Sequence, residues 1–235
     1  IRLSFAQAIS FQHNDLEDLE NKLKKNPPSV SGAVFIVTES VFSMDGDICP
    51  LEELVTLSQQ YNALVMVDEA HATGVMGENG EGLVQLLNLE SFVFARIHTF
   101  GKACGVHGAA VLGSRMLENY LVNFARSFIY STALPEQAAD HIRTSYELFP
   151  KLKAERKQLE KLVAHFQSSP ASGKMLKSRT PIQGIIIPGN KEVKLAAALL
   201  QQSGLDVRPI LYPTVPKGGE RLRIVLHSFN TETEL

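Results

Sequence analysis

The chain alternates between short, continuous apolar runs and segments in which apolar residues recur every three or four positions. Continuous apolar runs are typical of strands buried on both faces of a sheet, and the wider spacing is typical of amphipathic helices. The expected strands of the first half are 33–37, 63–67, 92–98 and 109–112. The expected helices around them are 15–25, 50–61 and 116–127. This alternation predicts an α/β domain with a mostly parallel sheet.

The pattern changes after residue 134. A long helical pattern occupies 135–168 and contains Pro150, a residue that kinks or breaks helices. The segment 169–173 (SPASG) interrupts it, and a shorter mixture follows: strands 182–187, 207–212 and 221–226 and a helix at 192–202. The predicted organisation is therefore part of a large α/β domain, a connecting helix and an incomplete small α+β domain, at 1–134, 135–168 and 169–235.

Composition excludes several classes of protein. The 235 residues are 44% hydrophobic and 20% charged, which is typical of a globular chain. A net charge of −2 argues against nucleic-acid binding through bulk positive charge, and no apolar run approaches the roughly 20 residues of a membrane span. Two cysteines form no disulfide framework or metal cluster, so we expect a reducing, cytoplasmic location. Because the sequence starts at Ile1 and looks cut at both ends, the absence of a signal peptide is uninformative.

Asp68 directly follows the apolar run 63–67, at the edge where the carboxyl ends of parallel strands meet. Such a residue either caps a turn or helix, or pairs with a cation, because an unpaired carboxylate is costly at a buried strand end. The tetrapeptide DEAH (68–71) also matches a magnesium-binding motif of helicases. That interpretation requires a G-x-x-x-x-G-K-[ST] phosphate loop, which this sequence lacks, and predicts ATP hydrolysis stimulated by RNA.

Lys102 follows the expected strand 92–98 in a turn of small residues. A solvated surface lysine is the ordinary alternative, but small neighbours let a flat ligand approach, and desolvated lysines form Schiff bases. The glycines do not match the G-x-G-x-x-G pattern of dinucleotide binding. A strand-end Asp68, His71 and Lys102 together indicate pyridoxal phosphate, since the carboxylate would keep the ring nitrogen protonated and the lysine would hold the cofactor as an imine.

Five stretches resemble the α-oxoamine synthases, a family of fold-type I pyridoxal-phosphate transferases, and they occur in the family's order. They are TESVFSMDGD (38–47), MVDEAHATGVMGENGEG (66–82), HTFGKACGVHGAAVLGS (98–114), FIYSTALP (128–135) and PTVPKGGERLRI (213–224). The resemblance implies a mostly parallel central sheet plus a small C-terminal α+β domain, with the N-terminal part of the family's fold missing.

Within the family, HGAAVLGS (107–114) departs from the Gly-Gly-aromatic pattern usual after the lysine in the glycine- and serine-using members, and the chain is most similar to the members that use L-alanine. The resemblance implies decarboxylative condensation of L-alanine with a pimeloyl thioester, carried by CoA or by an acyl carrier protein. The product would be 8-amino-7-oxononanoate, made in biotin biosynthesis. Alternatives are the same chemistry with glycine or serine and another acyl-CoA, and a truncated, non-catalytic chain that only dimerises. We expect no nucleic-acid or membrane partner, and weak or no cofactor binding if this fragment is the whole molecule.

The resemblance also implies roles at the cofactor. Lys102 resembles the Schiff-base lysine, which also moves the substrate's α-proton. Asp68 resembles the acid paired with the pyridine nitrogen, and His71 the histidine that hydrogen-bonds the phenolic oxygen. Thr99 resembles the phosphate-binding hydroxyl. Thr132, with Ser131 beside it, resembles the hydroxyl that reaches the phosphate of the other subunit in a homodimer with shared active sites.

Two further residues complete the predicted site. Ser43 lies where the family places a polar contact near the phenolic oxygen, and Arg223 resembles the arginine that holds the substrate carboxylate, a task suited to a planar guanidinium. Simple turn capping is the alternative for Ser43 and Thr132. Arg221 shares a strand face with Arg223, so the choice between these arginines rests on the resemblance. His98 and His107 are interpreted as polar fillers, and no metal site is predicted.

Overall fold

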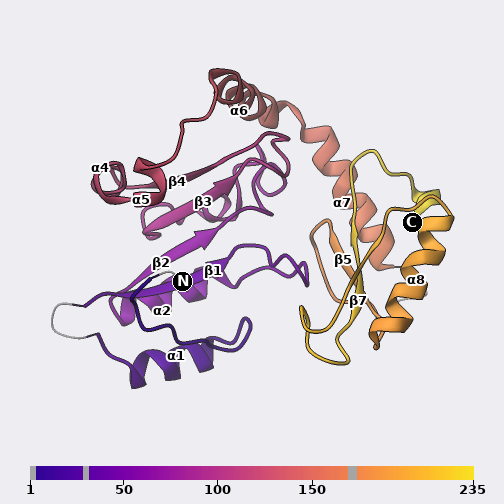
Figure 1. Ribbon diagram of the computed structural model, residues 1–235, viewed down its shortest axis with the longest axis horizontal. Helices are drawn as coiled ribbons and strands as arrows, with labels where there is room; N and C mark the ends of the chain where they lie inside the picture. The colour runs from indigo at the N-terminus through magenta and orange to yellow at the C-terminus, as the bar shows by residue number, and fades with distance from the viewer. Residues whose placement is uncertain (1–3, 29–31, 169–173) are drawn as a thin grey trace. The chain divides into compact units, whose positions relative to one another are not determined.

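A computed structural model describes residues 4–28, 32–168 and 174–235, which fold into two compact units (Figure 1). Of the described residues, the first unit takes in those within 1–40, 49–77 and 81–143, and the second takes in those within 41–48, 78–80 and 144–235. Two short segments, 41–48 and 78–80, thus belong to the second unit although elements of the first unit flank them in sequence. The domain boundaries expected from the sequence stay a prediction for the complete protein.

The first unit is built on a four-stranded sheet in the order β1-β2-β3-β4. Its strands are β1 (Val34–Glu39), β2 (Ala63–Asp68), β3 (Ala95–Thr99) and β4 (Ala109–Gly113). The first three strands run parallel and β4 runs antiparallel to β3. The register pairs Glu39 with Asp68 and Asp68 with Ile97, so the carboxyl ends of three strands meet at one edge. This edge is where open α/β sheets place their functional groups.

Helices α1 and α2 lie together on one side of this sheet (Figure 1). The helices of the unit are α1 (Leu16–Lys25), α2 (Leu51–Gln60), α3 (Leu83–Leu86), α4 (Arg115–Phe124) and α5 (Arg126–Ile129). The side chain of Asp15 accepts the backbone N–H of Asp18 and caps α1, close to the predicted start of this helix. Pro50 precedes α2, whose Leu51 and Leu54 are buried against the sheet side.

Two segments with one continuous helical pattern in the sequence are each divided in the structure. The pattern at 116–127 forms α4 and α5 instead of one helix, because Ala125 takes an extended conformation with ψ 99° between them. The long pattern at 135–168 forms α6 (Glu136–Leu148), a 3₁₀ turn (Phe149–Lys151) and α7 (Lys153–Gln167). Pro150 stands at the break, and its missing N–H cannot continue the α-helical hydrogen bonds.

The second unit contains a three-stranded antiparallel sheet in the order β5-β7-β6. Its remaining elements are β5 (Ile182–Ile186), α8 (Asn190–Gln202), β6 (Arg208–Ile210), β7 (Arg221–Val225) and a closing 3₁₀ turn (Glu232–Glu234). One core cluster joins α8 to Leu222 and another joins α7 to Leu226, and Ile185 and Ile224 contact both. Both helices therefore cover one sheet face, and strand alternation turns Arg221 and Arg223 to the other.

These elements confirm the predicted architecture of a mostly parallel sheet followed by a small α+β unit. Among the described ranges, no helix combines the length and the apolar character needed to cross a membrane.

Candidate active site

Asp68 is the last residue of β2, held in place by the fully buried Val65 and Val67. Its backbone carbonyl accepts hydrogen bonds from the amide and the hydroxyl of Ser40, at 2.9 and 3.2 Å. Its carboxylate oxygen Oδ1 accepts the amide of Ala70 at 2.9 Å. The half-buried carboxylate forms no ion pair with the residues that the structure describes. It is therefore fixed at the strand end and available to a cationic group.

The chain turns tightly after Asp68 and carries His71 along the same edge. The carbonyl of Glu69 accepts the amides of Ala72 and Thr73, at 3.0 and 2.9 Å, and the hydroxyl of Thr73 at 2.9 Å. These bonds form a single helical turn in which Ala72 and Thr73 are buried and His71 is half-buried. This turn therefore fixes the position of His71, which follows Asp68 by three residues in the sequence.

Thr99 ends β3, beside the end of β2. Its hydroxyl oxygen is buried and has no hydrogen-bond partner within the described part of the chain. Because Ile97 pairs with Asp68, strand alternation places the side chains of Asp68, Ile97 and Thr99 on one face of the sheet. Buried hydroxyls nearly always have a partner, so an orphaned one indicates a ligand atom that the protein alone does not supply.

Lys102 lies in the loop 100–108 that joins β3 to β4. Three backbone bonds shape this loop: Phe100 N–H to Gly108 at 2.9 Å, Val106 N–H to Phe100 at 2.8 Å, and Gly105 N–H to Lys102 at 2.9 Å. Gly105 has a φ of +65°, which glycine tolerates best. The exposed Lys102 amine forms no hydrogen bond or ion pair with the described residues. The loop thus presents a primary amine at the edge that carries Asp68 and Thr99.

Cys104 lies in the same loop but is buried. Burial raises the pKa of its thiol, which disfavours the thiolate that a nucleophile requires.

Thr132 lies in the exposed segment after α5. The hydroxyl of its neighbour Ser131 donates to the carbonyl of Ser127, so that hydroxyl is engaged within its own helical turn. The structure favours Thr132 over Ser131 as the side chain able to reach another molecule.

The second unit holds the other two predicted residues. The guanidinium Nε of Arg223 donates to the backbone carbonyl of Ser43 at 2.7 Å. Its two terminal nitrogens have no partner among the described residues, and burial lowers the pKa of this guanidinium. Arg221, in contrast, forms an ion pair with Asp45 and donates to the carbonyl of Gly219 at 2.8 Å. Arg223 therefore has the free donors that a carboxylate ligand needs, and Arg221 is committed to the fold.

The predicted residues thus fall into two groups. The first unit carries Asp68, His71, Thr99, Lys102 and Thr132, and the second carries Ser43 and Arg223. Their roles stay predictions.

Sequence reasoning missed one buried cluster at the same strand ends. It assigns no role to Glu69 or Arg96 and treats His98 as a filler, yet Arg96 and His98 both contact the buried carboxylate of Glu69. The available signal was the alternation of two basic residues along a strand of a buried sheet, which requires a buried opposite charge.

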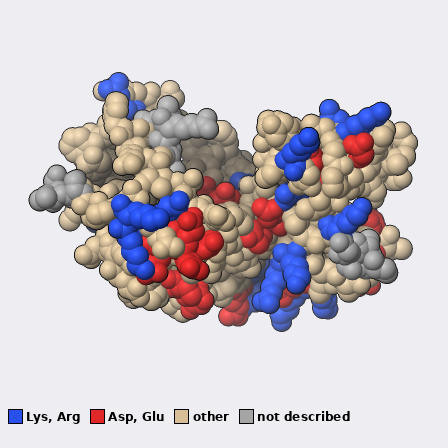
Figure 2. Space-filling model, turned by 90° about the horizontal axis from the view of Figure 1, so that it is seen from below, with Lys and Arg blue, Asp and Glu red and all other residues tan. Residues whose placement is uncertain are grey.

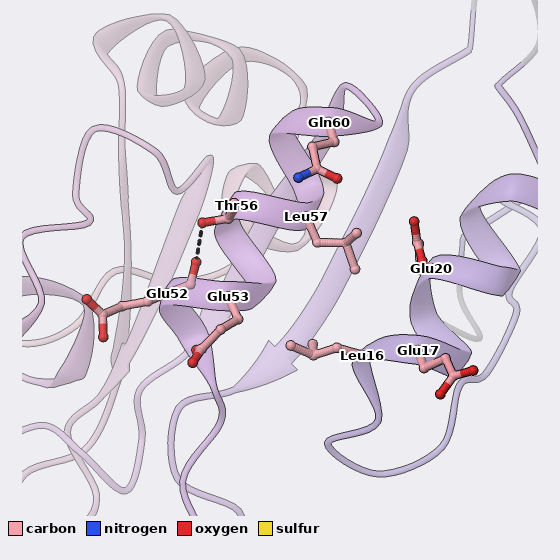
Figure 3. A pocket seen from close by; sticks show the side chains of 8 residues that line it. All are labelled: Leu16, Glu17, Glu20, Glu52, Glu53, Thr56, Leu57 and Gln60. Carbon is pink, nitrogen blue, oxygen red and sulfur yellow. Dashed lines mark hydrogen bonds between the residues drawn. The ribbon is translucent and has the colours of Figure 1, made fainter.

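The groove between α1 and α2, about 500 Å³ in volume, lies apart from this site (Figure 3). Its lining contains no predicted site residue and consists of Leu16, Glu17, Glu20, Glu52, Glu53, Thr56, Leu57 and Gln60. Figure 2 shows acidic and basic side chains side by side on the face that these helices form. Lys24, for example, pairs with Glu20 at 2.8 Å. Locally paired charges of this kind are ordinary for a solvated helix surface.

Comparison with known proteins gives consistent matches. The family model described as aminotransferase class I and II matches residues 1–235. An 8-amino-7-oxononanoate synthase from Lysinibacillus sphaericus is 40% identical over 236 residues, which covers 100% of this chain and 60% of the relative.

Two solved structures share the fold. The 8-amino-7-oxononanoate synthase of Francisella tularensis has a TM-score of 0.80 and 28% identity, over 94% of this chain and 63% of its own. A variant of serine palmitoyltransferase from S. paucimobilis, with a bound PLP–myriocin aldimine, has a TM-score of 0.85 and 26% identity, over 95% of this chain and 57% of its own. The present chain spans about 60% of the length of the curated relatives it matches.

Proposed function

The chain belongs to the aminotransferase class I and II family, and on that premise we propose that the protein carrying it is a pyridoxal-phosphate-dependent acyltransferase. In this proposal it condenses L-alanine with a pimeloyl thioester, releases CO₂ and the thiol, and forms 8-amino-7-oxononanoate for biotin biosynthesis. The whole-chain identity of 40% to a synthase of that name supports the choice of reaction.

One observation carries the proposal. Asp68, Thr99 and Lys102 lie at or next to adjoining strand ends. Among the described residues, the Asp68 carboxylate accepts the amide of Ala70 but has no cationic partner, and the Thr99 hydroxyl and the Lys102 amine have no hydrogen-bond partner. The groups are an anion, a buried hydroxyl and an amine. Pyridoxal phosphate carries the complementary groups: a protonatable ring nitrogen, a phosphate and an aldehyde. The residues present therefore fit the cofactor.

When bound, the cofactor withdraws electrons from the α-carbon of the amino acid. Asp68 would hold the proton on the ring nitrogen, because a carboxylate favours a nearby positive charge. His71 would donate a hydrogen bond to the phenolic oxygen, and Thr99 would donate to the phosphate. The amine of Lys102 would hold the cofactor and then, once the substrate displaces it, remove the α-proton.

Arg223 would bind the substrate carboxylate through its two free terminal nitrogens. Ser43 supports this role by fixing the guanidinium at Nε through its backbone carbonyl. The overall reaction balances. A carbon–carbon bond forms between the α-carbon and the thioester carbonyl as the thiol leaves, and the α-carboxylate then departs as CO₂ and is replaced by a proton.

The proposal includes a homodimer in which Thr132 reaches the phosphate in the partner subunit. The exposure of Thr132 and the engaged hydroxyl of Ser131 support it. Mixing a Lys102→Ala protein with a Thr132→Val protein tests it. Shared sites predict that mixed dimers regain part of the cofactor affinity and activity that each parent lacks. Unchanged behaviour on mixing, with subunit exchange verified, argues against shared sites. The low cysteine count, with Cys49 and Cys104 alone, supports a reducing compartment such as the cytoplasm.

The test of the proposed function uses the complete protein that contains this sequence. We expect added pyridoxal phosphate to give a visible absorption band and borohydride to fix the cofactor covalently to Lys102. Release of free thiol from pimeloyl-CoA should then require L-alanine. Trapping on another lysine, or thiol release that is independent of any amino acid, refutes the assignment. The Lys102→Arg variant keeps the charge and serves as the matched control that cannot be trapped.

A second candidate keeps the chemistry but uses serine or glycine with another acyl-CoA. The similarity to serine palmitoyltransferase, with a TM-score of 0.85, favours including it. Thiol release measured with alanine, glycine and serine against short and long acyl-CoA thioesters distinguishes the two. The preferred pair is the one with the highest kcat/KM.

A further inference from the structure

A buried cluster of charged side chains at the strand ends takes no part in the proposed chemistry. Glu69 follows Asp68 directly, and Arg96 and His98 alternate along β3. The side chain of Glu69 is 0% exposed, and those of Arg96 and His98 are 11% and 6% exposed. Buried charges are energetically costly unless they are well paired. The presence of this cluster therefore indicates a role outside the proposed chemistry.

Both carboxylate oxygens of Glu69 are occupied. Oε2 accepts Nε of Arg96 at 2.7 Å and lies 2.6 Å from its Nη2, and Nε2 of His98 lies 3.2 Å from the same oxygen. Oε1 accepts the backbone N–H of Val84 at 2.9 Å. Burial acts to raise the pKa of Glu69, but the contacts with His98, the Val84 amide and the Arg96 charge outweigh it and lower the pKa. The carboxylate is therefore ionised and fully paired.

The cluster ties three segments together. Arg96 also donates from Nη2 to the carbonyl of Glu81 at 3.1 Å, so the segment that starts α3 is joined to β2 and β3. Gly82 has a φ of +96°, and a Cβ placed there would lie 2.7 Å from Oε1 of Glu69. The glycine thus leaves the space that the carboxylate occupies.

The cluster and the candidate site lie on opposite faces of the same strand ends. The register pairs Val67 with Arg96 and Asp68 with Ile97, so alternation turns Arg96 and His98 to the face of Glu69, away from Asp68 and Thr99. The backbone of Glu69 is also anchored, because its N–H donates to Ile97 at 2.9 Å and its carbonyl forms the turn that carries His71. Glu69 thus stands between two residues predicted to contact the cofactor.

We propose that Glu69, Arg96 and His98 act as a positioning clamp that fixes Asp68 and His71 relative to Thr99 from the opposite face of the sheet. The clamp would set the alignment of the cofactor's ring nitrogen and phenolic oxygen with their partners. This inference rests on the proposed function and deepens it, since it assigns a role to three residues that touch neither substrate nor cofactor.

The test compares Glu69→Gln with Glu220→Gln in the complete protein. Glutamine keeps the size of the side chain and one oxygen acceptor but removes the charge. Glu220 is a matched control, since it is 3% exposed and accepts the backbone amides of Gly189 and Gly218 in the other unit. Three quantities are measured: pyridoxal-phosphate affinity, the pH midpoint of the visible band of the bound cofactor, and amide hydrogen exchange at 68–76 without cofactor.

For Glu69→Gln we expect cofactor affinity at least about tenfold weaker, a displaced band midpoint and faster exchange at 68–76. Glu220→Gln should leave the affinity and the midpoint unchanged even where its thermal stability falls. A merely structural role predicts that both variants lose stability and that neither moves the band midpoint, which overturns the clamp. If Glu69→Gln does not fold, His98→Gln is judged by the same three measurements.

A failure of the proposed function can be distinguished from a failure of the clamp proposal. A wild-type protein that shows no visible band and no borohydride trapping overturns the proposed function and the clamp with it. A wild-type protein that binds the cofactor, beside a folded Glu69→Gln protein with wild-type affinity and band midpoint, overturns the clamp alone.

Discussion

Replacing Thr99 by valine should have opposite effects on the protein without cofactor and on the protein with it. The hydroxyl oxygen of Thr99 is buried and has no hydrogen-bond partner among the described residues. Valine has nearly the same shape and replaces this hydroxyl with a methyl group. In the absence of cofactor, the exchange removes a desolvated polar group that costs roughly 1–3 kcal/mol when unpaired.

We therefore expect Thr99→Val to be neutral or stabilising by about 1 kcal/mol without cofactor. With cofactor, the lost hydrogen bond to a charged phosphate should cost about 1.5–3 kcal/mol, which corresponds to roughly 10- to 100-fold weaker binding. Thr180→Val is the matched control, because the Thr180 hydroxyl is buried and donates to the carbonyl of Gly46 at 2.9 Å in the other unit. Its removal should destabilise the protein by about 1–2 kcal/mol.

The assay is urea unfolding of the cofactor-free proteins, followed by pyridoxal-phosphate titration of each at fixed pH. The reasoning fails if Thr99→Val lowers the urea midpoint as much as Thr180→Val does, since the Thr99 hydroxyl would then have a partner within the protein. It also fails if Thr99→Val binds the cofactor with wild-type affinity.

Three further predictions follow from the same contacts. Arg223→Lys should raise KM for the amino acid about tenfold or more with a smaller change in kcat, because an ammonium cannot make the two parallel hydrogen bonds of a guanidinium. A fall in kcat as large as the rise in KM would contradict this prediction. The pKa of Glu69 in the folded protein is lowered from its ordinary value of 4.5. Its contribution to stability is therefore complete above about pH 4.5 and is lost as the pH falls through the lowered pKa of the folded protein. The urea midpoints of the wild type and of Glu69→Gln should converge in that acid range. Gly82→Ala should destabilise by about 1–3 kcal/mol in thermal unfolding, because φ is +96° and the new methyl group would meet the Glu69 carboxylate; a neutral result would show that the segment relaxes freely.

The sequence predicted most of the elements because their signals are local. Continuous apolar runs located β1 and β2 to within about two residues, and the apolar spacing from residue 15 onward located α1. The strand-end positions of Asp68 and Thr99 and the loop position of Lys102 also follow from the order of runs and turns along the chain. The break of the long helical pattern near Pro150 has the same local origin.

Contacts between distant segments could not be predicted from these local sequence signals. The separation of α4 from α5 depends on an extended Ala125, a residue with no turn signal of its own. The choice between Arg221 and Arg223 was open from strand alternation, because both share a face. The structure separates them through segment 41–48, whose Asp45 pairs with Arg221 and whose Ser43 carbonyl accepts from Arg223.

The sequence by itself determined the α/β architecture, the order of its elements and the residue types at the strand ends, because hydrophobic periodicity and motif spacing are properties of neighbouring residues. Only the tertiary structure decided which polar groups are satisfied. Within residues 4–28, 32–168 and 174–235, it left the Thr99 hydroxyl and the Lys102 amine without partners, and it paired Glu69 with Arg96, 27 residues further along the chain. Burial and pairing arise when distant segments pack together, and the energetic cost of leaving a buried group unpaired then distinguishes residues that hold the fold from those available to a ligand.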